Sequence, residues 1–271
     1  MIRIFSLLVG AFFTVVLGWS FLVGAHTAVT EPKTLSAEKV FHLKPEPFHL
    51  SSDGVFGKFD RQQLQRGFKV YQEVCAACHS IKHVAFRDLA ALGYNEAEVK
   101  AIAAKATVSA KDPLTGELKD RPGLPADKFP PVVYAGLGVP PDLSLITKAR
   151  PNGPAYVHSL LTGYRDQPAE LLKQFPEAKT GDGLHYNPYF ANLNLAMAPP
   201  LTGEGQVTYS DGTKATVEQM STDVTAFLVW TAEPKLEQRR QTGLWWLGFL
   251  LFATVLGYMA YRNIWAEKKG H

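Results

Sequence analysis

The run Cys75-Ala76-Ala77-Cys78-His79 constrains this chain more than any other feature. Two thiols with two residues between them lie about one helical turn apart, so both can add to the two vinyl groups of a single haem. The adjacent histidine is then placed to bind the iron as its proximal ligand. These are also the only 2 cysteines among the 271 residues. The motif therefore predicts one haem c, covalently bound through Cys75 and Cys78, with His79 on the iron.

Three other uses of a Cys-x-x-Cys pair are less consistent with the sequence. A disulfide between Cys75 and Cys78 would close a very small loop and add little stability. A thioredoxin-type redox pair requires a strand before the motif, whereas Leu64, Phe68 and Tyr71 recur upstream at helical intervals. A zinc site requires a second pair of ligands, and the sequence has no further cysteine to supply one.

The C-terminal part of the chain contains a candidate membrane anchor. Residues 243–261 carry no charged side chain, and a helix of that length crosses most of the hydrocarbon core of a bilayer. Beyond it, basic residues outnumber acidic ones, which predicts that the tail stays in the cytoplasm. We therefore expect residues 239–271 to form a transmembrane anchor with a short cytoplasmic tail. Aromatic residues suited to the membrane interfaces lie at both ends of the span: Trp245, Trp246, Tyr258, Tyr261 and Trp265.

The N-terminus allows two interpretations. Residues 4–25 form an uncharged apolar run after Arg3 and end in Val23-Gly24-Ala25, which resembles a signal-peptidase site. The run is nevertheless long enough to span a membrane itself. Residues 1–25 are thus either a cleaved export signal or a retained N-terminal membrane helix. Both interpretations place residues 26–238 in the periplasm, on the outer face of a bacterial inner membrane, where oxidising conditions prevail.

The distribution of charge supports this division and argues against nucleic-acid binding. Residues 26–238 carry 22 Lys and Arg against 24 Asp and Glu, whereas the whole chain has a formal net charge of +3. The basic excess therefore flanks the two apolar runs and does not form a phosphate-binding surface.

The exported part predicts a mainly α domain with long irregular loops wrapped around a large cofactor. Asp60 is a suitable N-cap for the helix that leads into the haem motif, Asn95 is a capping residue at the start of a second helix, and Thr216 with Gln219 resembles a capping box. The turn dipeptide Asp211-Gly212 predicts a small hairpin. We expect helices near residues 61–75, 95–106, 154–165 and 216–232, and irregular chain at 27–58, 111–141 and 164–194.

The residue that binds the second axial position of the iron decides whether the haem carries electrons or binds ligands. His83 is too close to His79 in sequence to reach the opposite face easily, and Met220 fits the apolar pattern of a core helix. His158 and His185 are more typical of ordinary polar or core histidines. Met197 lies in a loop that two prolines stiffen directly afterwards, so it is the ligand that we favour. Thioether ligation would raise the reduction potential.

Taken together, these motifs and their order resemble the cytochrome c1 family, the membrane-anchored haem subunits of quinol–cytochrome c reductase, the cytochrome bc1 complex. The resemblance covers most of residues 55–265. It implies a class I cytochrome c-like haem domain with long loop insertions and a C-terminal transmembrane helix. The segments that carry it are residues 56–60, 66–71, 75–79, 140–144, 148–150, 159–164, 186–190, 197–200, 209–213 and 223–235.

The resemblance also implies roles for individual residues. Met197 would be the sixth iron ligand, Arg150 and Tyr156 would bind the haem propionates, and Pro141 would pack on the haem plane. A guanidinium suits the propionate role because it can bind a carboxylate through two hydrogen bonds. A surface arginine and a core tyrosine remain the alternative for Arg150 and Tyr156.

The function implied by the resemblance is respiratory electron transport. One electron would pass from the Rieske iron–sulfur protein to cytochrome c, within a dimeric membrane complex that also contains cytochrome b. The chain would thus be a subunit of an oxidoreductase and would make no bonds itself. Two alternatives remain: a membrane-anchored shuttle cytochrome that serves a terminal oxidase, and a ligand sensor with an open sixth site. Four acidic residues are candidates to steer a basic partner, or are simply a solvated face: Asp166, Glu170, Glu177 and Asp182.

Overall fold

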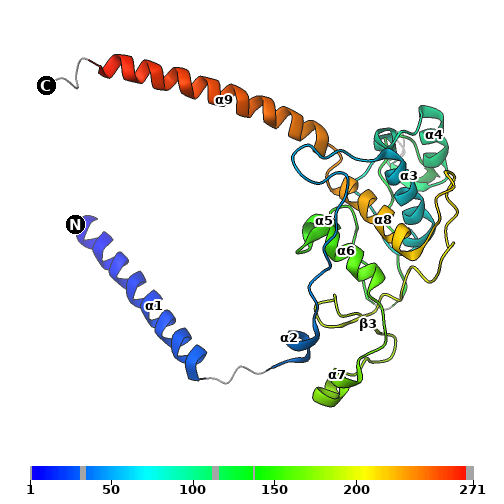
Figure 1. Ribbon diagram of the computed structural model, residues 1–271, viewed down its shortest axis with the longest axis horizontal. Coiled ribbons are helices and arrows are strands. Elements are labelled where there is room, and N and C mark those ends of the chain that lie inside the picture. Colours follow the sequence, from blue (N-terminus) through cyan, green and yellow to red (C-terminus); the bar gives the residue numbers. More distant parts are fainter. Residues whose placement is uncertain (1, 31–34, 112–115, 137, 267–271) are drawn as a thin grey trace. The chain divides into compact units, whose positions relative to one another are not determined.

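The computed structural model describes residues 2–30, 35–111, 116–136 and 138–266 and divides into two units, residues 1–40 and 41–271. The first unit contains the long helix α1, Ile2–Thr30. The second contains the remaining helices and two short antiparallel sheets, so the expected mainly α fold is confirmed (Figure 1). Its helices are α3 (Arg61–Val70), η1 (Tyr71–Cys75), η2 (Phe86–Leu92), α4 (Glu96–Ala104), α5 (Ile146–Ala149), α6 (Gly153–Thr162), α7 (Ala169–Gln174), η3 (Pro176–Ala178), α8 (Val217–Ala232) and α9 (Leu236–Trp265), while α2 (Ala37–Phe41) spans the boundary between the units.

Helices α3 and α8 cross at the centre of the second unit (Figure 1). The crossing is close because Gly67 of α3 lies against α8: a Cβ on this residue would be 2.0 Å from the carbonyl oxygen of Asp223 and 2.7 Å from Cβ of Phe227. Only glycine fits at such a contact. The crossing therefore fixes α3, and with it the haem motif that follows, against α8.

An aromatic cluster fills the space beside this crossing. The ring of Phe227 on α8 lies 5.4 Å from that of Phe68 and 5.7 Å from those of Tyr71 and Trp230. All four side chains are at most 2% exposed. Burying one such ring stabilises the fold by about 1.5–3 kcal/mol, so the helix that leads to Cys75 is held mainly by packing.

Local capping signals are confirmed where the sequence predicted them. The Asp60 carboxylate accepts hydrogen bonds from the backbone N–H groups of Gln62 and Gln63, and Asn95 caps α4 in a capping box with Glu98. Thr216 caps α8 through the N–H of Gln219, at 3.0 Å. The helix predicted from residue 154 is present as α6.

The helix that carries the motif changes its winding before the cysteines. Beyond α3 the chain forms the π-helical turn η1, in which the N–H of Ala76 donates to the carbonyl oxygen of Tyr71 at 2.8 Å. A π turn inserts one extra residue and rotates the side chains that follow it, and such turns are frequent at functional sites. The sequence pattern predicted continuous helix here, so the π turn is a new finding.

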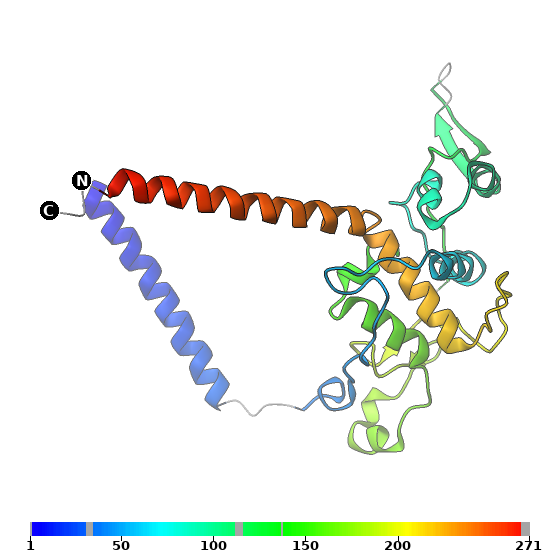
Figure 2. The same ribbon diagram turned by 45° about the horizontal axis from the view of Figure 1, so that its top comes forward.

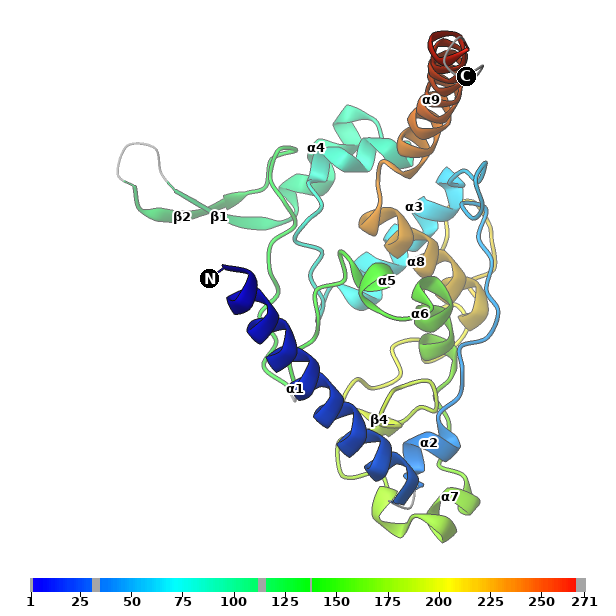
Figure 3. The ribbon, with the colours of Figure 1, turned by 90° about the vertical axis from the view of Figure 1, so that its left-hand side faces the viewer.

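The predictions of irregular chain at 111–141 and 164–194 need correction. The first of these segments contributes to an antiparallel hairpin, β1 (Thr107–Lys111) with β2 (Leu118–Pro122), which projects from the domain (Figure 3). Its turn, like residue 137, lies outside the described residues. Helix α7 and the short pair β3 (His185–Tyr186) with β4 (Asn194–Leu195) interrupt the segment expected to be irregular at 164–194.

The hairpin predicted around Asp211-Gly212 is also wrong, although a turn is present there. Asp211 does not join a pair of strands: its carboxylate accepts a hydrogen bond from Arg66 of α3 at 2.8 Å. Arg66 also donates to both carboxylate oxygens of Asp223, at 2.9 and 3.2 Å. Through Arg66, the side chain of Asp211 is thus linked to α3 and α8.

The segment expected as an extended arm at 27–58 is mixed. Helix α1 continues to Thr30, residues 31–34 lie outside the described residues, and α2 follows. The chain then runs in extended form, where Leu43 N–H donates to the carbonyl oxygen of Pro188 at 2.9 Å and Glu46 N–H to Ser159 Oγ at 2.9 Å. The arm therefore contacts the haem domain through residues 42–50.

Within the described residues, α1 and α9 are the two helices long and apolar enough to cross a membrane, by length and composition. The most apolar 18-residue window of each has no buried residue. Helix α9 includes the predicted span 243–261 and extends away from α8 (Figure 2). Helix α1 runs without a break through the candidate cleavage site at Ala25, and a cleaved signal would satisfy the same criteria. Both interpretations of the N-terminus therefore remain.

Candidate functional site

The Cys-x-x-Cys-His motif closes into a tight turn at the end of η1. The backbone N–H groups of Cys78 and His79 both donate to the carbonyl oxygen of Cys75, at 3.1 and 2.9 Å. The two thiols are free, so the disulfide alternative is not supported. Burial raises the pKa of Cys75 to about 12, which keeps that thiol neutral. All three side chains line one cavity.

The imidazole of His79 is oriented by the backbone. Its Nδ1 lies 2.8 Å from the carbonyl oxygen of Pro141. Because a carbonyl can only accept, Nδ1 must carry the proton, which leaves the lone pair of Nε2 for a metal. A metal-binding histidine commonly has this arrangement. Pro141, predicted to pack on the haem, thus has a second role through its carbonyl group.

Asp142 holds the segment that carries this carbonyl. Its carboxylate accepts hydrogen bonds from Ser80 Oγ at 3.0 Å, from Lys82 N at 2.9 Å and from Ser144 N at 3.0 Å. Burial alone would raise the pKa of Asp142, but the hydrogen bonds from these neighbours together lower it. The charged carboxylate therefore joins the residues after His79 to the residues after Pro141.

We expect Asp142→Ala to destabilise the protein by about 2–4 kcal/mol, because three hydrogen bonds to a carboxylate are lost together. Since the folded pKa lies below the unfolded value, the contribution of Asp142 is present above the unfolded pKa and is lost as the pH falls through the folded one. Thermal unfolding of the haem-containing protein between neutral and acidic pH measures both effects. Asp142→Asn keeps the shape of the side chain and one acceptor oxygen, so its stability should lie between those of the wild type and Asp142→Ala. An alanine variant as stable as the wild type would contradict this role.

The cavity itself is large and mainly apolar. Its volume is about 620 Å³, within the range of ligand and cofactor pockets. The lining includes both cysteines and His79 from the motif and Met197 from the other end of the domain. The remaining lining is mostly aliphatic and aromatic: Val74, Tyr134, Val139, Pro140, Leu143, Ile146, Val157, Leu160, Leu161, Phe190, Leu195, Ala196, Pro199, Pro200, Val224 and Leu228 are among it. An apolar cavity with two thiols and an oriented imidazole fits a covalently bound haem.

Met197 lies on a segment that is held in place locally. Strand β4 precedes it, and the hydroxyl of Tyr164 donates to its carbonyl oxygen at 3.0 Å. Leu193, the residue before β4, has a positive φ of 65°. The thioether is half-buried and reaches the cavity lined by His79.

The other candidates for the second axial position lie elsewhere. Met220 is fully buried in the core, and His158 is buried with its ring stacked 4.3 Å from that of Phe48. His158 Nε2 lies 2.9 Å from Glu218. His83 is exposed. Among the described residues that line the cavity, Met197 is the only methionine and His79 the only histidine.

Arg150 and Tyr156, the predicted propionate ligands, both line the cavity. Arg150 is exposed, and Tyr156 is half-buried. Burial raises the pKa of Tyr156, while the charge of Arg150 and a hydrogen bond between the two side chains oppose that shift. A cation and a hydroxyl at the same rim form a donor pair suited to a carboxylate.

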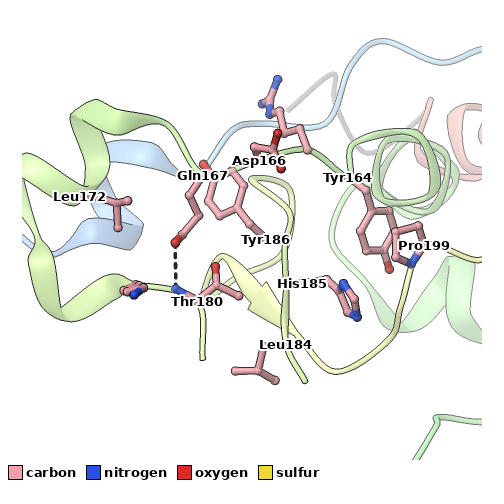
Figure 4. A pocket seen from close by; sticks show the side chains of 11 residues that line it. Tyr164, Asp166, Gln167, Leu172, Thr180, Leu184, His185, Tyr186 and Pro199 are labelled. Atoms are coloured by element: carbon pink, nitrogen blue, oxygen red, sulfur yellow. Dashed lines mark hydrogen bonds between the residues drawn. The ribbon is translucent and has the colours of Figure 1, made fainter. Parts of the chain in front are cut away.

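A second hollow of about 560 Å³ lies beside the first and shares Pro199 with it (Figure 4). His185 lines this second hollow, together with Tyr164 and Asp166. Gln167 and Thr180 in its lining are joined by a hydrogen bond: the side-chain oxygen of Gln167 accepts the N–H of Thr180 at 2.8 Å. In the described part of the chain no three His, Cys, Asp or Glu side chains are grouped to hold a metal ion.

Sequence reasoning gave no role to several positioning residues. Tyr71 donates its hydroxyl to the carbonyl oxygen of His79 at 3.0 Å, and Asp142 and Tyr164 hold the two segments described above. The only sequence signal was that Asp142 follows two prolines. Their partners lie up to 62 residues away along the chain, so a local pattern could not identify them.

Comparison with known proteins identifies the family that the sequence resembled. Residues 50–268 match the model of the Cytochrome C1 family. The chain belongs to the cytochrome c1 family. Cytochrome c1 of Rhodospirillum rubrum is 41% identical over 233 residues, which cover 80% of this chain and 85% of that protein. Cytochrome c1 of Cereibacter sphaeroides is 39% identical over 267 residues, or 84% and 89% of the two chains.

The name of a plant relative includes the cofactor. "Cytochrome c1 1, heme protein, mitochondrial" of Arabidopsis thaliana is 42% identical over 245 residues, covering 86% of this chain and 76% of that protein. Membership of the cytochrome c1 family confirms the prediction of a haem c cofactor. It also makes this chain a haem-containing electron-transfer subunit of the bc1 complex, an oxidoreductase.

Proposed function

We propose that this chain takes one electron from the Rieske iron–sulfur protein and delivers it to cytochrome c, as a subunit of a dimeric quinol–cytochrome c reductase that also contains cytochrome b. The observation that supports this most strongly is the single cavity lined by Cys75, Cys78, His79 and Met197. Bound there, the haem supplies the chemistry, a one-electron change at its iron.

The residues of the cavity have separate roles in this proposal. Cys75 and Cys78 attach the cofactor covalently. His79, whose tautomer Pro141 fixes, would hold the iron through Nε2, and Met197 would hold it through its sulfur. A histidine–methionine pair leaves no open site for exogenous ligands and raises the potential, which suits transfer and not ligand sensing.

Arg150 and Tyr156 bind the haem propionates in this proposal. Both line the cavity and interact with each other. A guanidinium offsets the charge of a carboxylate and binds it through two donors. The apolar side chains of the cavity exclude water from the rest of the site.

We place residues 26–238 in the periplasm and residues 239–271 as the anchor in the bacterial inner membrane. Helix α9 is long enough to span the bilayer, and aromatic residues near its ends suit the interfaces. The basic residues of the predicted cytoplasmic tail at 267–271 lie outside the described residues. Residues 1–25 are either an export signal or a second membrane helix.

Purification of the chain from its own membrane tests the proposal. We expect cytochrome b and a Rieske protein to purify with it, and added cytochrome c to be reduced when a quinol is supplied. The reduced native protein should not bind carbon monoxide. Isolation without these partners would instead favour a shuttle cytochrome, and a carbon monoxide spectral shift would favour an open sixth site.

The four acidic residues that could steer a basic partner are expected to have only a modest effect on the rate of cytochrome c reduction. The acidic residues Asp166, Glu170, Glu177 and Asp182 are all exposed. Residues 165–182 also contain three basic side chains against these four acidic ones. Exposed charges this close largely cancel beyond a Debye length of about 10 Å.

We therefore expect neutralisation of all four acidic residues to slow the reduction of cytochrome c by less than about tenfold at low salt. The difference should vanish at high ionic strength, because screening removes long-range steering. Stopped-flow rates over a salt series measure this. A rate that falls equally at all salt concentrations would contradict steering and indicate damage to the site.

A further inference from the structure

The loop at residues 51–59, between the N-terminal arm and α3, has an apolar tip in solvent. Val55 is 59% exposed and Phe56 is 82% exposed. Lys58, two residues further on, is exposed as well. A mostly exposed phenylalanine next to an exposed valine is unusual here, because no other phenylalanine among described residues 41–235 is exposed.

The loop is internally fixed, so its tip does not fold back onto the core. Lys58 N–H donates to the carbonyl oxygen of Ser51 at 3.0 Å and closes the loop at its base. Gly54 has a positive φ of 72°. A Cβ on Gly57 would be 2.0 Å from the carbonyl oxygen of Asp53, so this turn accepts only glycine.

The loop is also bound to the first turns of α9. Arg240 Nη1 donates to the carbonyl oxygens of Ser52 and Gly57, at 2.7 and 3.2 Å. Phe59 N–H donates to Glu237 Oε1 at 2.7 Å. The loop projects on the side of the domain from which α9 leaves (Figures 1 and 2). At about 1.5 Å per residue, Arg240 precedes Trp245 by only about 7.5 Å of helix.

We propose that Val55 and Phe56 insert into the interfacial region of the bilayer beside α9. The 51–59 loop then forms a second membrane contact that fixes the tilt of the haem domain. Lys58 contacts lipid phosphates at the same level, since a basic side chain next to aromatic ones is typical of interfacial anchors. The inference rests on the proposed membrane span of α9.

Lipid fits this surface better than a protein partner does. The exposed apolar tip comprises two residues, whereas a stable protein interface buries roughly 800 Å² on each side and about 20 residues. The contacts of Arg240 and Glu237 keep the loop beside the helix that lipid surrounds in this proposal. Interfacial insertion requires only a short apolar tip close to the headgroups.

Spin labels on the intact complex, purified and placed in lipid nanodiscs, test the inference. Three single variants carry the label: Phe56→Cys at the tip, Leu251→Cys inside α9, and Leu118→Cys on the β1–β2 hairpin. Leu118 and Leu251 are both 69% exposed, so they are matched references for water and lipid. An unchanged haem spectrum shows that each variant is folded. Relaxation by oxygen, which concentrates in lipid, is compared with relaxation by a water-soluble nickel complex.

We expect the oxygen-to-nickel ratio at residue 56 to exceed that at residue 118 severalfold and to lie below that at residue 251. A ratio at residue 56 equal to that at residue 118 would overturn the inference. Protection of residue 56 from both reagents would overturn it as well, since a protein subunit would then cover the loop. If residue 251 itself is accessible to nickel, the membrane span of α9 is wrong, and that failure is distinct from the other two.

Discussion

Met197→Leu is expected to lower the reduction potential of the haem by about 120 mV or more and to stop the delivery of electrons to cytochrome c. Leucine has nearly the volume of methionine, so the cavity and the fold survive. It has no sulfur lone pair, and the preference of thioether ligation for the ferrous state is lost. A hundredfold change in that preference corresponds to about 120 mV, at about 59 mV for each factor of ten. Potentiometric titration, together with the thioether–iron absorption of the oxidised protein, measures the change.

Met220→Leu is the matched control. This residue is fully buried in the core and does not line the cavity, so the same chemical change should leave the spectrum and the potential as they are. Carbon monoxide should bind the reduced Met197→Leu protein and not the control. If Met197→Leu keeps the wild-type spectrum and potential, then Met197 is not the ligand. The electron-transfer proposal would then lose its main structural support.

Short-range signals account for the part of the fold that the sequence predicted correctly. Asp60, Asn95 and Thr216 each cap a helix through N–H groups two or three residues away, so the cap and its partner are visible in one stretch of sequence. The covalent motif is of the same kind. Its thiols and histidine lie within one turn, and the chemistry follows from their spacing.

Long-range contacts account for the errors. The pattern at Asp211-Gly212 predicted a hairpin because turn residues carry that local preference. The carboxylate of Asp211 instead binds Arg66, 145 residues away, and the segment forms no strand pair. The orientation of His79 depends in the same way on a carbonyl group 62 residues further along the chain.

The choice of Met197 lies between these two cases. The sequence showed a methionine before two prolines, and a family resemblance, but no evidence that the residue approaches His79. The structure adds that both residues line one cavity, and the Met197 segment follows β4, Leu193 with its positive φ, and the contact from Tyr164. None of these has a sequence signal that could have been weighed in advance.

Arg66→Met is expected to lower the free energy of unfolding by about 3–5 kcal/mol, the cost of leaving a buried charge without its partner. Asp223 is completely buried, and Arg66 donates to both of its carboxylate oxygens. Methionine can replace the aliphatic stem of Arg66 but not its guanidinium. The hydrogen bond that Gln219 donates to Asp223, at 2.9 Å, would remain. Thermal unfolding of the purified haem protein in detergent measures the loss.

Arg66 also makes the free energy of unfolding depend on pH, through Asp211. The N–H of Thr213 and then the guanidinium of Arg66 lower the pKa of Asp211 from 3.8 to about 2. Because the folded pKa is the lower one, the contribution of Asp211 is present above about pH 4 and is lost as the pH falls through about 2. Part of this acid-dependent loss should therefore be missing in Arg66→Met.

Arg121→Met separates the effect of burial from the effect of losing an ion pair. Arg121 binds both carboxylate oxygens of Asp127, at 2.6 and 2.9 Å, but its side chain is 35% exposed. Water can solvate the carboxylate that remains, so the expected cost is much smaller than that of Arg66→Met. If both arginine variants lost the same stability, burial of Asp223 would not be the cause. The Arg66 network would then be an ordinary surface ion pair that contributes little to holding α3, and the haem motif after it, against α8.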